Sequence, residues 1–308
     1  MMNKPKCISC GNTKLLFWAK TTDTEYKSTK EIFSFYLCEP CDSLSIFPIP
    51  HDQIQEIYPS NYYSYKATST SLAFRIKTFL DQAAYRKLLK QIPGSELKIL
   101  DIGGGQGSAL SQIRKADSRV AVTQIVDYGE TLRSEAEKLG HLYFSSGIQA
   151  FETNERYDLI VLLSVIEHVS NPLEILIKCK SMMTENGRIL IQTPNFRSLD
   201  AHIFKNLNWG GFHSPRHWIL FSKESFLKIV SQAELETAEF RYIQGAIFWS
   251  WSMMSLLDRW GFIRITKEKP VSEFALTNFF ALLFAALEIL RLPFFKTSQF
   301  QSLLKNPK

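Results

Sequence analysis

The stretch ILDIGGGQGSAL, residues 99–110, joins a short apolar run to an acidic residue and a cluster of glycines. The apolar run is typical of a buried strand that ends at Asp101, and the helical pattern that follows extends to about residue 116. Three glycines stand at alternate positions between the two elements: Gly103, Gly105 and Gly107. Glycines let the backbone turn sharply and approach a ligand, and the free N–H groups at a helix start bind polar or anionic groups. The stretch therefore predicts a strand, a ligand-binding turn and a helix in succession.

The same rhythm of apolar runs and helical stretches continues toward the C-terminus. The apolar runs are continuous rather than alternating, which indicates a parallel sheet covered by helices on both faces. We therefore expect an α/β fold with a doubly wound sheet. Further strands are expected at 120–127, 141–146, 157–164, 187–193, 237–243 and 298–305, and helices at 129–140, 171–183 and 223–233.

A second acidic residue, Asp127, ends the next expected strand, 26 residues after Asp101. An acid in this place is suited to bind both ribose hydroxyls of a nucleoside. The turn has the spacing D-x-G-x-G-x-G, whereas the dinucleotide fingerprint is G-x-G-x-x-G. The leading Asp101 would repel a pyrophosphate but attract the ammonium group of a methionine. A nicotinamide-dependent oxidoreductase is the alternative, and the spacing argues against it.

With these residues the chain resembles the class I, seven-stranded methyltransferases that use S-adenosylmethionine. The resemblance covers residues 97–243 and, more loosely, 298–307. It includes YDLIVLLSVIEHVSNP, residues 157–172, which keeps the Glu167–His168 pair and an Asn-Pro helix start, and the later segments GRILIQTPN and HWILFSKESF. The resemblance implies a Rossmann-like sheet of seven strands. It places S-adenosylmethionine against five residues: Asp101, Gly103, Gly105, Gly107 and Asp127.

Three histidines are candidates for the base that methyl transfer to a hydroxyl requires. His168 follows an expected strand at the carboxyl edge of the sheet, where ligands bind in such folds. His213 and His217 lie in the segment NWGGFHSPRHWILFS, residues 208–222, which resembles zinc-containing methyltransferases acting on sugars and polyketide-type acceptors. Those that methylate sugar carbons carry a His-Glu-His grouping there. This chain has Pro-Arg-His, so only His217 carries over, as base or acceptor-orienting residue.

Three further residues near these histidines are predicted to bind the acceptor. Glu167 is placed to orient a metal or the acceptor, and Trp209 lies in the same loop as His213 and His217. Arg216 is suited to an acceptor phosphate or carboxylate. A loop-stabilising role for Arg216 is equally compatible with the sequence.

Two Cys-x-x-Cys pairs precede this region, Cys7/Cys10 and Cys38/Cys41. Four thiolates in two tight turns complete a tetrahedron around Zn²⁺ and leave no open position, so we expect a structural zinc. Gly11 follows the first pair, as zinc knuckles prefer, whereas Asp42 after the second departs from that habit. Residues 1–65 are therefore predicted to form a zinc-ribbon-like module. By resemblance it packs on the catalytic domain and, with YPSNYYSY, helps shape the acceptor entrance.

Residues 66–93 read as an amphipathic linker helix that Pro93-Gly94 stops, and residues 94–308 as the methyltransferase domain. Within that domain, residues from 244 to about 297 form an apolar, aromatic helical insertion. Nine basic and four acidic residues lie from 241 onward, a combination suited to a membrane interface. A helical cap or a dimer surface fits the same residues equally well. The oligomeric state stays open.

Composition limits the remaining choices. A net charge of +6 on 308 residues is too mild for a nucleic-acid binder. The N-terminus shows no apolar segment typical of a secretory signal, so a cytoplasmic location, with possible membrane association, is expected. We predict a methyltransferase that acts, most plausibly at oxygen, on a small-molecule, glycan or lipid-linked acceptor. A zinc-ribbon scaffold with a degenerate methyltransferase domain is the non-enzymatic alternative, and the intact acidic pair opposes it.

Overall fold

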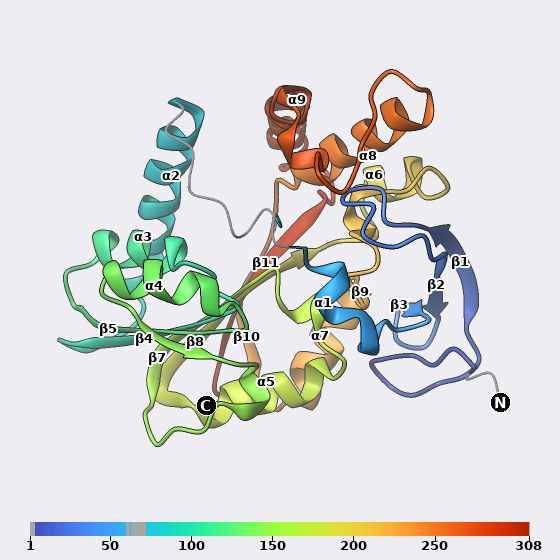
Figure 1. The fold of residues 1–308 in the computed structure, drawn as a ribbon. Helices are drawn as coiled ribbons and strands as arrows, with labels where there is room; N and C mark the ends of the chain where they lie inside the picture. The colour runs from blue at the N-terminus through green and yellow to red at the C-terminus, as the bar shows by residue number, and fades with distance from the viewer. Residues whose placement is uncertain (1–3, 60–61, 63–71, 308) are drawn as a thin grey trace.

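Seven strands form one mixed sheet in the order β10-β11-β8-β7-β4-β5-β6. The computed structural model describes residues 4–59, 62 and 72–307 (Figure 1). Neighbouring strands from β8 to β6 are parallel, while β11 runs antiparallel to both β8 and β10. The strands are β4 (Leu97–Ile102), β5 (Val120–Asp127), β6 (Leu142–Ser145), β7 (Tyr157–Leu163), β8 (Met183–Pro194), β10 (Glu236–Ile243) and β11 (Gln299–Lys305).

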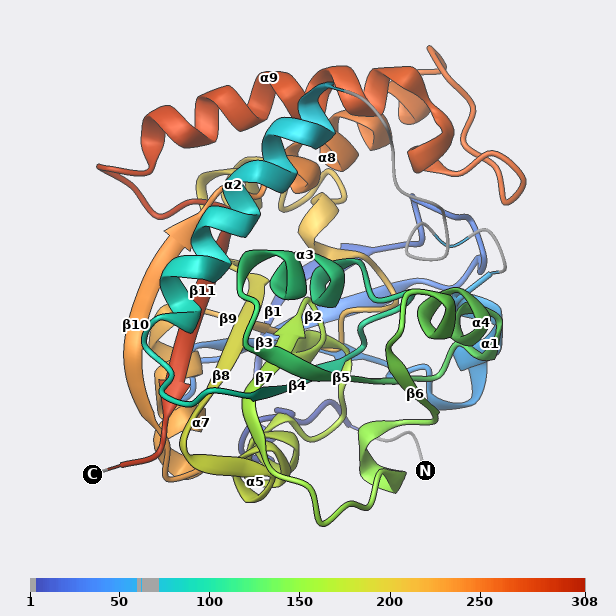
Figure 2. The same ribbon diagram turned by 90° about the vertical axis from the view of Figure 1, so that its left-hand side faces the viewer.

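Helices cover both faces of this sheet, as expected for continuous apolar strands. Helices α3 (Ser108–Ala116) and α4 (Glu130–Lys138) lie on one face, and α5 (Pro172–Ser181) and α7 (Lys223–Gln232) on the other (Figure 2). Each layer has its own apolar cluster against the sheet. The expected α/β, Rossmann-like architecture is thereby confirmed.

The N-terminal segment shares a second, four-stranded antiparallel sheet with a strand from the histidine loop. Its order is β1-β2-β3-β9, so the short strand β9 pairs with β3 across most of the chain length. One apolar cluster joins side chains of these strands to the loop and to the insertion. The predicted boundary at residue 65 lies outside the described residues. The strands are β1 (Leu16–Thr21), β2 (Phe33–Cys38), β3 (Ser43–Phe47) and β9 (Ile219–Phe221).

The expected linker helix is α2 (Leu72–Leu89), and its predicted beginning at 66–71 lies outside the described residues. Its C-terminal end packs on the sheet, where Leu89 and the following Ile92 join the apolar cluster beside α3. Phe79 and Leu80, which the periodicity places on the buried stripe, are 70% and 60% exposed. The amphipathic pattern therefore predicts the helix but not which side packs.

The insertion consists of two helices, α8 (Ala246–Arg259) and α9 (Ala275–Arg291), which lie against each other along one side of the molecule (Figures 1 and 2). Among the described helices, none combines the length and apolar character needed to cross a bilayer. Short elements complete the chain: η1 (His51–Gln53), α1 (Ile54–Ile57), η3 (Ile148–Ala150), η4 (Ile166–His168), α6 (Leu199–Ile203), η5 (Gly210–Phe212) and η6 (Val271–Glu273).

Helix α9 reverses the burial pattern of an ordinary amphipathic surface helix, because polar residues are buried and many apolar ones are exposed. Thr277 and Glu288 are its two buried residues. The Glu288 carboxylate accepts hydrogen bonds from the Trp249 indole at 3.2 Å and from the backbone N–H of Ser298 at 2.9 Å. The apolar side chains face outward and are between 38% and 73% exposed: Leu276, Phe279, Leu282, Leu283, Leu287, Ile289 and Leu290.

Candidate active site

The glycine turn lies between β4 and α3, with Asp101 at its base. Asp101 is 2% exposed, and its Oδ2 atom has no hydrogen-bond partner among the described residues. Burial, together with the nearby charge of Asp127, raises the pKa of Asp101 to about 8. A Cβ at Gly104 would stand 2.6 Å from that Oδ2 atom, so this position also requires glycine. The turn therefore encloses a buried carboxyl group that lacks a hydrogen-bond donor at Oδ2, which suits a cationic ligand.

Asp127, at the end of the adjacent strand β5, reaches back to the same turn. Its Oδ2 accepts from the Gly105 N–H at 2.9 Å, and its Oδ1 accepts from the Gly129 N–H at 3.1 Å. A carboxylate has about four acceptor positions, so lone pairs remain for a diol. Gly107 begins α3 with φ +83°, and a Cβ there would lie 2.4 Å from the His141 ring. The structure thus places all five predicted cofactor residues around one turn.

Glu167 lies just beyond β7, in η4, and is completely buried. The Thr193 hydroxyl donates to its Oε2 at 2.9 Å, whereas Oε1 has no hydrogen-bond partner among the described residues. Burial raises the pKa of Glu167 to about 8. The Trp218 N–H donates to the Glu167 carbonyl at 2.8 Å, which fixes the histidine loop against this strand end.

The loop brings the three candidate histidines together. Ring centroids of His168 and His217 are 4.6 Å apart, and those of His213 and His217 are 5.0 Å apart. The Nδ1 atom of His217 lies 2.9 Å from the Gly211 carbonyl, so Nδ1 carries the proton and Nε2 keeps its lone pair. Burial lowers the pKa of His168 to about 3 and that of His217 well below 6.5. Both imidazoles are therefore neutral near pH 7.

His213 belongs to a hydrogen-bonded chain that begins in the N-terminal segment. Its Nδ1 contacts the Glu25 carboxyl, and its Nε2 lies 2.9 Å from the Tyr62 hydroxyl. Burial raises the pKa of Glu25 and lowers that of His213, which favours a neutral, proton-sharing pair. His213 has φ +37°, an uncommon conformation for a non-glycine residue that is often found at functional sites.

A cavity of about 200 Å³ adjoins these histidines. Ser164, at the end of β7, and His213 and His217 form its polar wall. Ser164 also has a positive φ, +56°. The rest of the lining comes from the insertion, apart from Gln299 of β11, and combines three apolar side chains with four polar ones: Ile247, Phe248, Trp251, Ser272, Thr277, Asn278 and Gln299.

Arg216 does not face this cavity. Its guanidinium is completely buried, donates to the Asp23 carboxylate at 2.9 Å and to the Ile57 carbonyl at 2.7 Å, and lies 4.5 Å from the centre of the Tyr26 ring. We therefore reassign Arg216 from acceptor binding to fastening the loop to the N-terminal segment.

Trp209 is likewise a core residue. It is 2% exposed, its indole donates to the Asp200 carboxylate at 2.6 Å, and its ring packs against Phe212 at 5.4 Å. Because no side of the ring is open to an acceptor, we also withdraw Trp209 from the acceptor-binding set.

Two acids of the site, Asp23 and Glu25, were not predicted from the sequence, and Tyr58 and Tyr62 were predicted only as part of the run YPSNYYSY at the acceptor entrance. The Tyr58 hydroxyl lies 3.0 Å from His168 Nδ1, and Tyr62 contacts His213. The tyrosine-rich run at 58–65 was a usable signal for both tyrosines, although residues 60–61 and 63–65 lie outside the described part. The two acids carry no pattern of their own and become recognisable only through their partners.

The four cysteines of the two pairs converge at the N-terminus. Their four Sγ atoms all lie within 4.8 Å of one another, and the Sγ atoms of Cys10 and Cys38 are 3.8 Å apart. Ligands of a tetrahedral ion at a Zn–S distance of about 2.3 Å are roughly 3.8 Å apart, so the cluster fits Zn²⁺. Gly11 and Asp42 follow the pairs with φ of +72° and +57°. Asp42 adopts this turn conformation and also pairs with Arg197, which accounts for an acid at that position.

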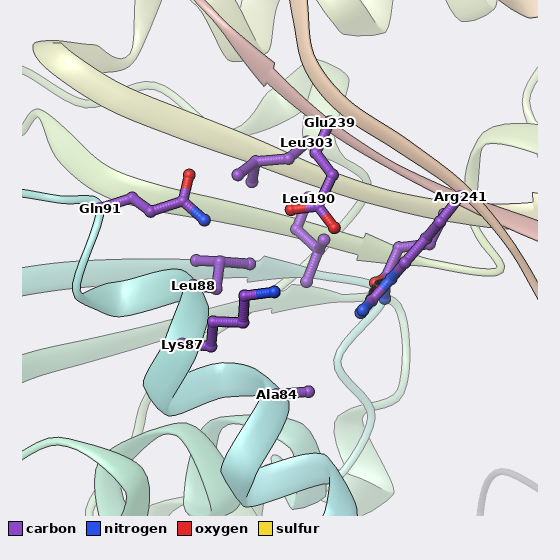
Figure 3. Close-up of a pocket in the computed structure, with 9 residues that line it drawn as sticks. Ala84, Lys87, Leu88, Gln91, Leu190, Glu239, Arg241 and Leu303 are labelled. Atoms are coloured by element: carbon purple, nitrogen blue, oxygen red, sulfur yellow. Dashed lines mark hydrogen bonds between the residues drawn. The ribbon is translucent and has the colours of Figure 1, made fainter.

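A second cavity lies between the C-terminal part of α2 and the sheet (Figure 3). Lys87 of α2 and Gln91, which follows the helix, line it together with Glu239 and Arg241 of β10. Its volume is about 30 Å³, room for little more than a water molecule. It is too small for an acceptor.

Comparison with known proteins agrees with this geometry. The chain is 27% identical over 149 residues to a ubiquinone biosynthesis O-methyltransferase of Parvibaculum lavamentivorans, covering 47% of this chain and 57% of that protein. It is 30% identical over 115 residues to the protein of the same name from Actinobacillus pleuropneumoniae. This match covers 34% of this chain and 49% of that protein. The chain thus spans about half the length of the curated relatives it matches.

The fold is shared with coclaurine N-methyltransferase, solved with N-methylheliamine and S-adenosylhomocysteine. The TM-score is 0.51 at 15% identity, over 81% of this chain and 79% of that one. A family model described as a methyltransferase domain matches residues 75–239, more than half of the 308 residues. This match spans the glycine turn, both acidic strand ends and the histidine loop, and the chain belongs to the methyltransferase domain family.

Proposed function

We propose that this protein transfers the methyl group of S-adenosylmethionine to a hydroxyl oxygen of a small-molecule, glycan or lipid-linked acceptor. The observation that carries the proposal is the buried Asp101 carboxyl group, which has no partner at Oδ2 among the described residues and lies beneath a turn in which a Cβ at Gly103, Gly104 or Gly107 would approach neighbouring atoms too closely. The α-ammonium of the cofactor would supply the missing counter-charge. Asp127 would bind the ribose hydroxyls, and the N–H groups of the turn would face the remaining polar atoms.

The acceptor would occupy the cavity beside His217. Methyl transfer is an in-line displacement in which the acceptor oxygen bonds to the methyl carbon while the carbon–sulfur bond breaks, leaving S-adenosylhomocysteine. The hydroxyl proton must leave, and the unprotonated Nε2 of His217 is oriented by the Gly211 carbonyl to accept it. His213 and His168 would help to position the acceptor. Oxygen is favoured because the matched relatives are named O-methyltransferases.

We further propose that the cysteine cluster binds one structural zinc. The fit of the four sulfur atoms to a tetrahedral ion supports this, and four thiolates leave no position for substrate. When bound, the ion would hold together the turn that precedes β1 and the turn that follows β2. It would therefore stabilise the segment that supplies Asp23, Glu25 and the two tyrosines to the site.

The outer face of the insertion supports a third part of the proposal, contact with an anionic membrane surface. The exposed apolar side chains of α9 continue into Phe294 and Phe295, which are 77% and 61% exposed. Five exposed basic residues belong to the same insertion: Arg259, Arg264, Lys267, Lys269 and Lys296. A helix that buries its carboxylate and exposes leucines and phenylalanines suits the lipid interface better than water. Because α8 and α9 also line the cavity, a lipophilic acceptor would have a short path to it from the bilayer.

Calorimetry and product analysis test the central part. The purified chain is titrated with S-adenosylmethionine and, separately, with a nicotinamide dinucleotide. S-adenosylhomocysteine release is then measured with phenolic quinone-like, nucleotide-sugar and lipid-linked acceptors. Binding of the sulfonium cofactor alone, with turnover on one acceptor class, supports methyl transfer. Binding of the dinucleotide alone would favour an oxidoreductase, and binding of neither would favour a scaffold.

A further inference from the structure

We propose that Glu167, His168 and His217 bind a divalent transition-metal ion, separate from the cysteine cluster, with open coordination positions toward the acceptor cavity. We call these three residues the Glu-His-His triad. A carboxylate oxygen and one ring nitrogen of each histidine lie within 4.8 Å of one another. Two imidazoles and one carboxylate are the ligand set that holds Fe²⁺, Zn²⁺ or Co²⁺ while leaving coordination positions open.

The first observation is the Glu167 carboxylate. Its side chain is completely buried, yet only Oε2 has a hydrogen-bond donor, the Thr193 hydroxyl. The second oxygen, Oε1, lies 3.8 Å from His217 Nε2, which is too far for a hydrogen bond. Buried polar atoms are rarely left unsatisfied, and an orphaned one commonly marks an absent ion or water.

The second observation is the orientation of the imidazoles. His217 Nδ1 lies 2.9 Å from the Gly211 carbonyl, and His168 Nδ1 lies 3.0 Å from the Arg216 carbonyl. Both carbonyls are acceptors, so each Nδ1 carries the proton and each Nε2 keeps a lone pair. Backbone carbonyls orient metal-binding histidines in this way.

These observations fit a cation between the ligands. His217 Nε2 and Glu167 Oε1 approach to 3.8 Å without forming a hydrogen bond, an arrangement that a positive ion between them would stabilise. Ligand atoms about 2.1 Å from one ion stand roughly 3–4 Å apart, so the 3.8 Å separation fits directly. The whole set needs only a small contraction. The ion would also offset the cost of burying an ionised Glu167.

The site lies where an ion would meet the acceptor. His217 is both a triad member and a wall of the cavity, beside Ser164. An acceptor hydroxyl bound at an open position would have its pKa lowered by the ion, as metal-bound water does. In the loaded site His217 would therefore act as a ligand, with the ion rather than the free imidazole activating the hydroxyl. This role rests on the proposed methyl transfer, whereas ion binding itself does not.

The test measures ion binding without turnover. Wild-type chain and the Glu167→Gln variant are equilibrated by dialysis with buffered Zn²⁺, and zinc per chain is determined by mass spectrometry. Gln keeps the shape and the hydrogen bond to Thr193 but loses the charge. Two ions are expected in the wild type and one in the variant. Glu174→Gln, at the exposed start of α5, is the matched control and should keep two. A wild-type content of one ion, in the cysteine cluster, would overturn the proposal.

Cobalt provides a second measurement that does not depend on stoichiometry. Co²⁺ added to wild type that holds one equivalent of zinc, in the cysteine cluster, should give weak visible d–d absorption without thiolate charge-transfer bands, because the triad contains no sulfur. Glu167→Gln should bind Co²⁺ at least about tenfold more weakly. Identical titrations of the two proteins would contradict the site. S-adenosylmethionine calorimetry on the same samples separates this failure from failure of the proposed methyl transfer.

Discussion

The Asp23 carboxylate and the Arg216 guanidinium meet at 2.9 Å, with both side chains completely inaccessible to solvent. The two residues are 193 positions apart and connect the N-terminal segment to the histidine loop. Burial alone would raise the pKa of Asp23, but the charge and hydrogen bonds of Arg216 lower it to about 2. The pair thus holds the backbone from which His213 and His217 reach the cavity.

Asp23→Asn should destabilise the protein by about 3–5 kcal/mol, because it leaves the buried Arg216 charge uncompensated. Urea denaturation measures the change in the free energy of unfolding. Asp117→Asn, which removes the partner of the partly exposed Arg119, is the control and should cost at most about 1 kcal/mol. Equal effects of the two substitutions would show that the Asp23–Arg216 pair is not a major support.

The buried Asp101 predicts an unusual pH dependence of stability. Its pKa is about 8 in the folded protein, above the ~3.9 of an unfolded chain. Ionisation is therefore easier after unfolding, and this residue lowers the free energy of unfolding as the pH rises from about 4 to about 8. Asp101→Asn should be more stable than wild type at pH 8, by on the order of a few kcal/mol, and similar to it near pH 4. A stability difference that does not vary with pH would contradict this assignment.

His217→Gln should lower turnover by about 100-fold or more while leaving S-adenosylmethionine affinity unchanged, since the side chain faces the acceptor cavity and not the glycine turn. Steady-state kinetics and calorimetry measure the two quantities. His202→Gln, outside the cavity lining, is the matched control and should retain activity. Full activity of the His217 variant would remove that residue from the mechanism.

Cys38→Ser should lose the zinc of the cysteine cluster and unfold at a lower temperature, because three thiolates hold the ion less tightly than four. Cys179→Ser, a buried thiol of α5 away from the cluster, should keep the metal content of wild type. Metal analysis and thermal unfolding of both variants check this. An unchanged metal content in Cys38→Ser would contradict a four-cysteine zinc site.

The combined change Phe279→Ser, Leu283→Ser and Leu290→Ser should weaken sedimentation with anionic phospholipid vesicles by at least about tenfold, since each buried CH₂ contributes about 0.8 kcal/mol. Leu139→Ser with Leu142→Ser removes exposed leucines elsewhere and is the control. Wild type and both sets of variants should bind less to neutral vesicles than to anionic ones. No wild-type binding to anionic vesicles would exclude the membrane surface as the partner of α9.

Local sequence signals predicted most of the fold. Continuous apolar strands, helix starts such as Asn171-Pro172 and the alternating glycines of the turn depend on neighbouring residues alone. The capping bond from the Glu174 N–H to Asn171 Oδ1, at 3.2 Å, is one such local interaction. Local patterns also placed Asp101 and Asp127 at the ends of their strands. Because parallel strands end at one edge of the sheet, the two residues were expected near each other.

Long-range pairing explains what could not be predicted. Strand β9 joins the N-terminal sheet through three backbone pairs with β3, and no periodicity indicates that partner. Glu25 reaches His213 across 188 positions. Arg216 and Trp209 appeared to be ligand residues because polar and aromatic side chains in a loop are often functional, yet buried acids bind both of them. Helix α9 departs from the usual burial of apolar side chains and exposure of charged ones. Its Glu288 carboxylate can be buried because N–H donors in the interior form hydrogen bonds with it.

Calorimetric titration of S-adenosylmethionine into wild type and Asp101→Asn tests the central claim most directly. We expect wild type to bind the cofactor, and the variant to bind at least about tenfold more weakly, because a charged hydrogen bond contributes about 1.5–3 kcal/mol. Asp117→Asn should match wild type. Equal affinity in wild type and Asp101→Asn, or no binding to wild type, would contradict the account.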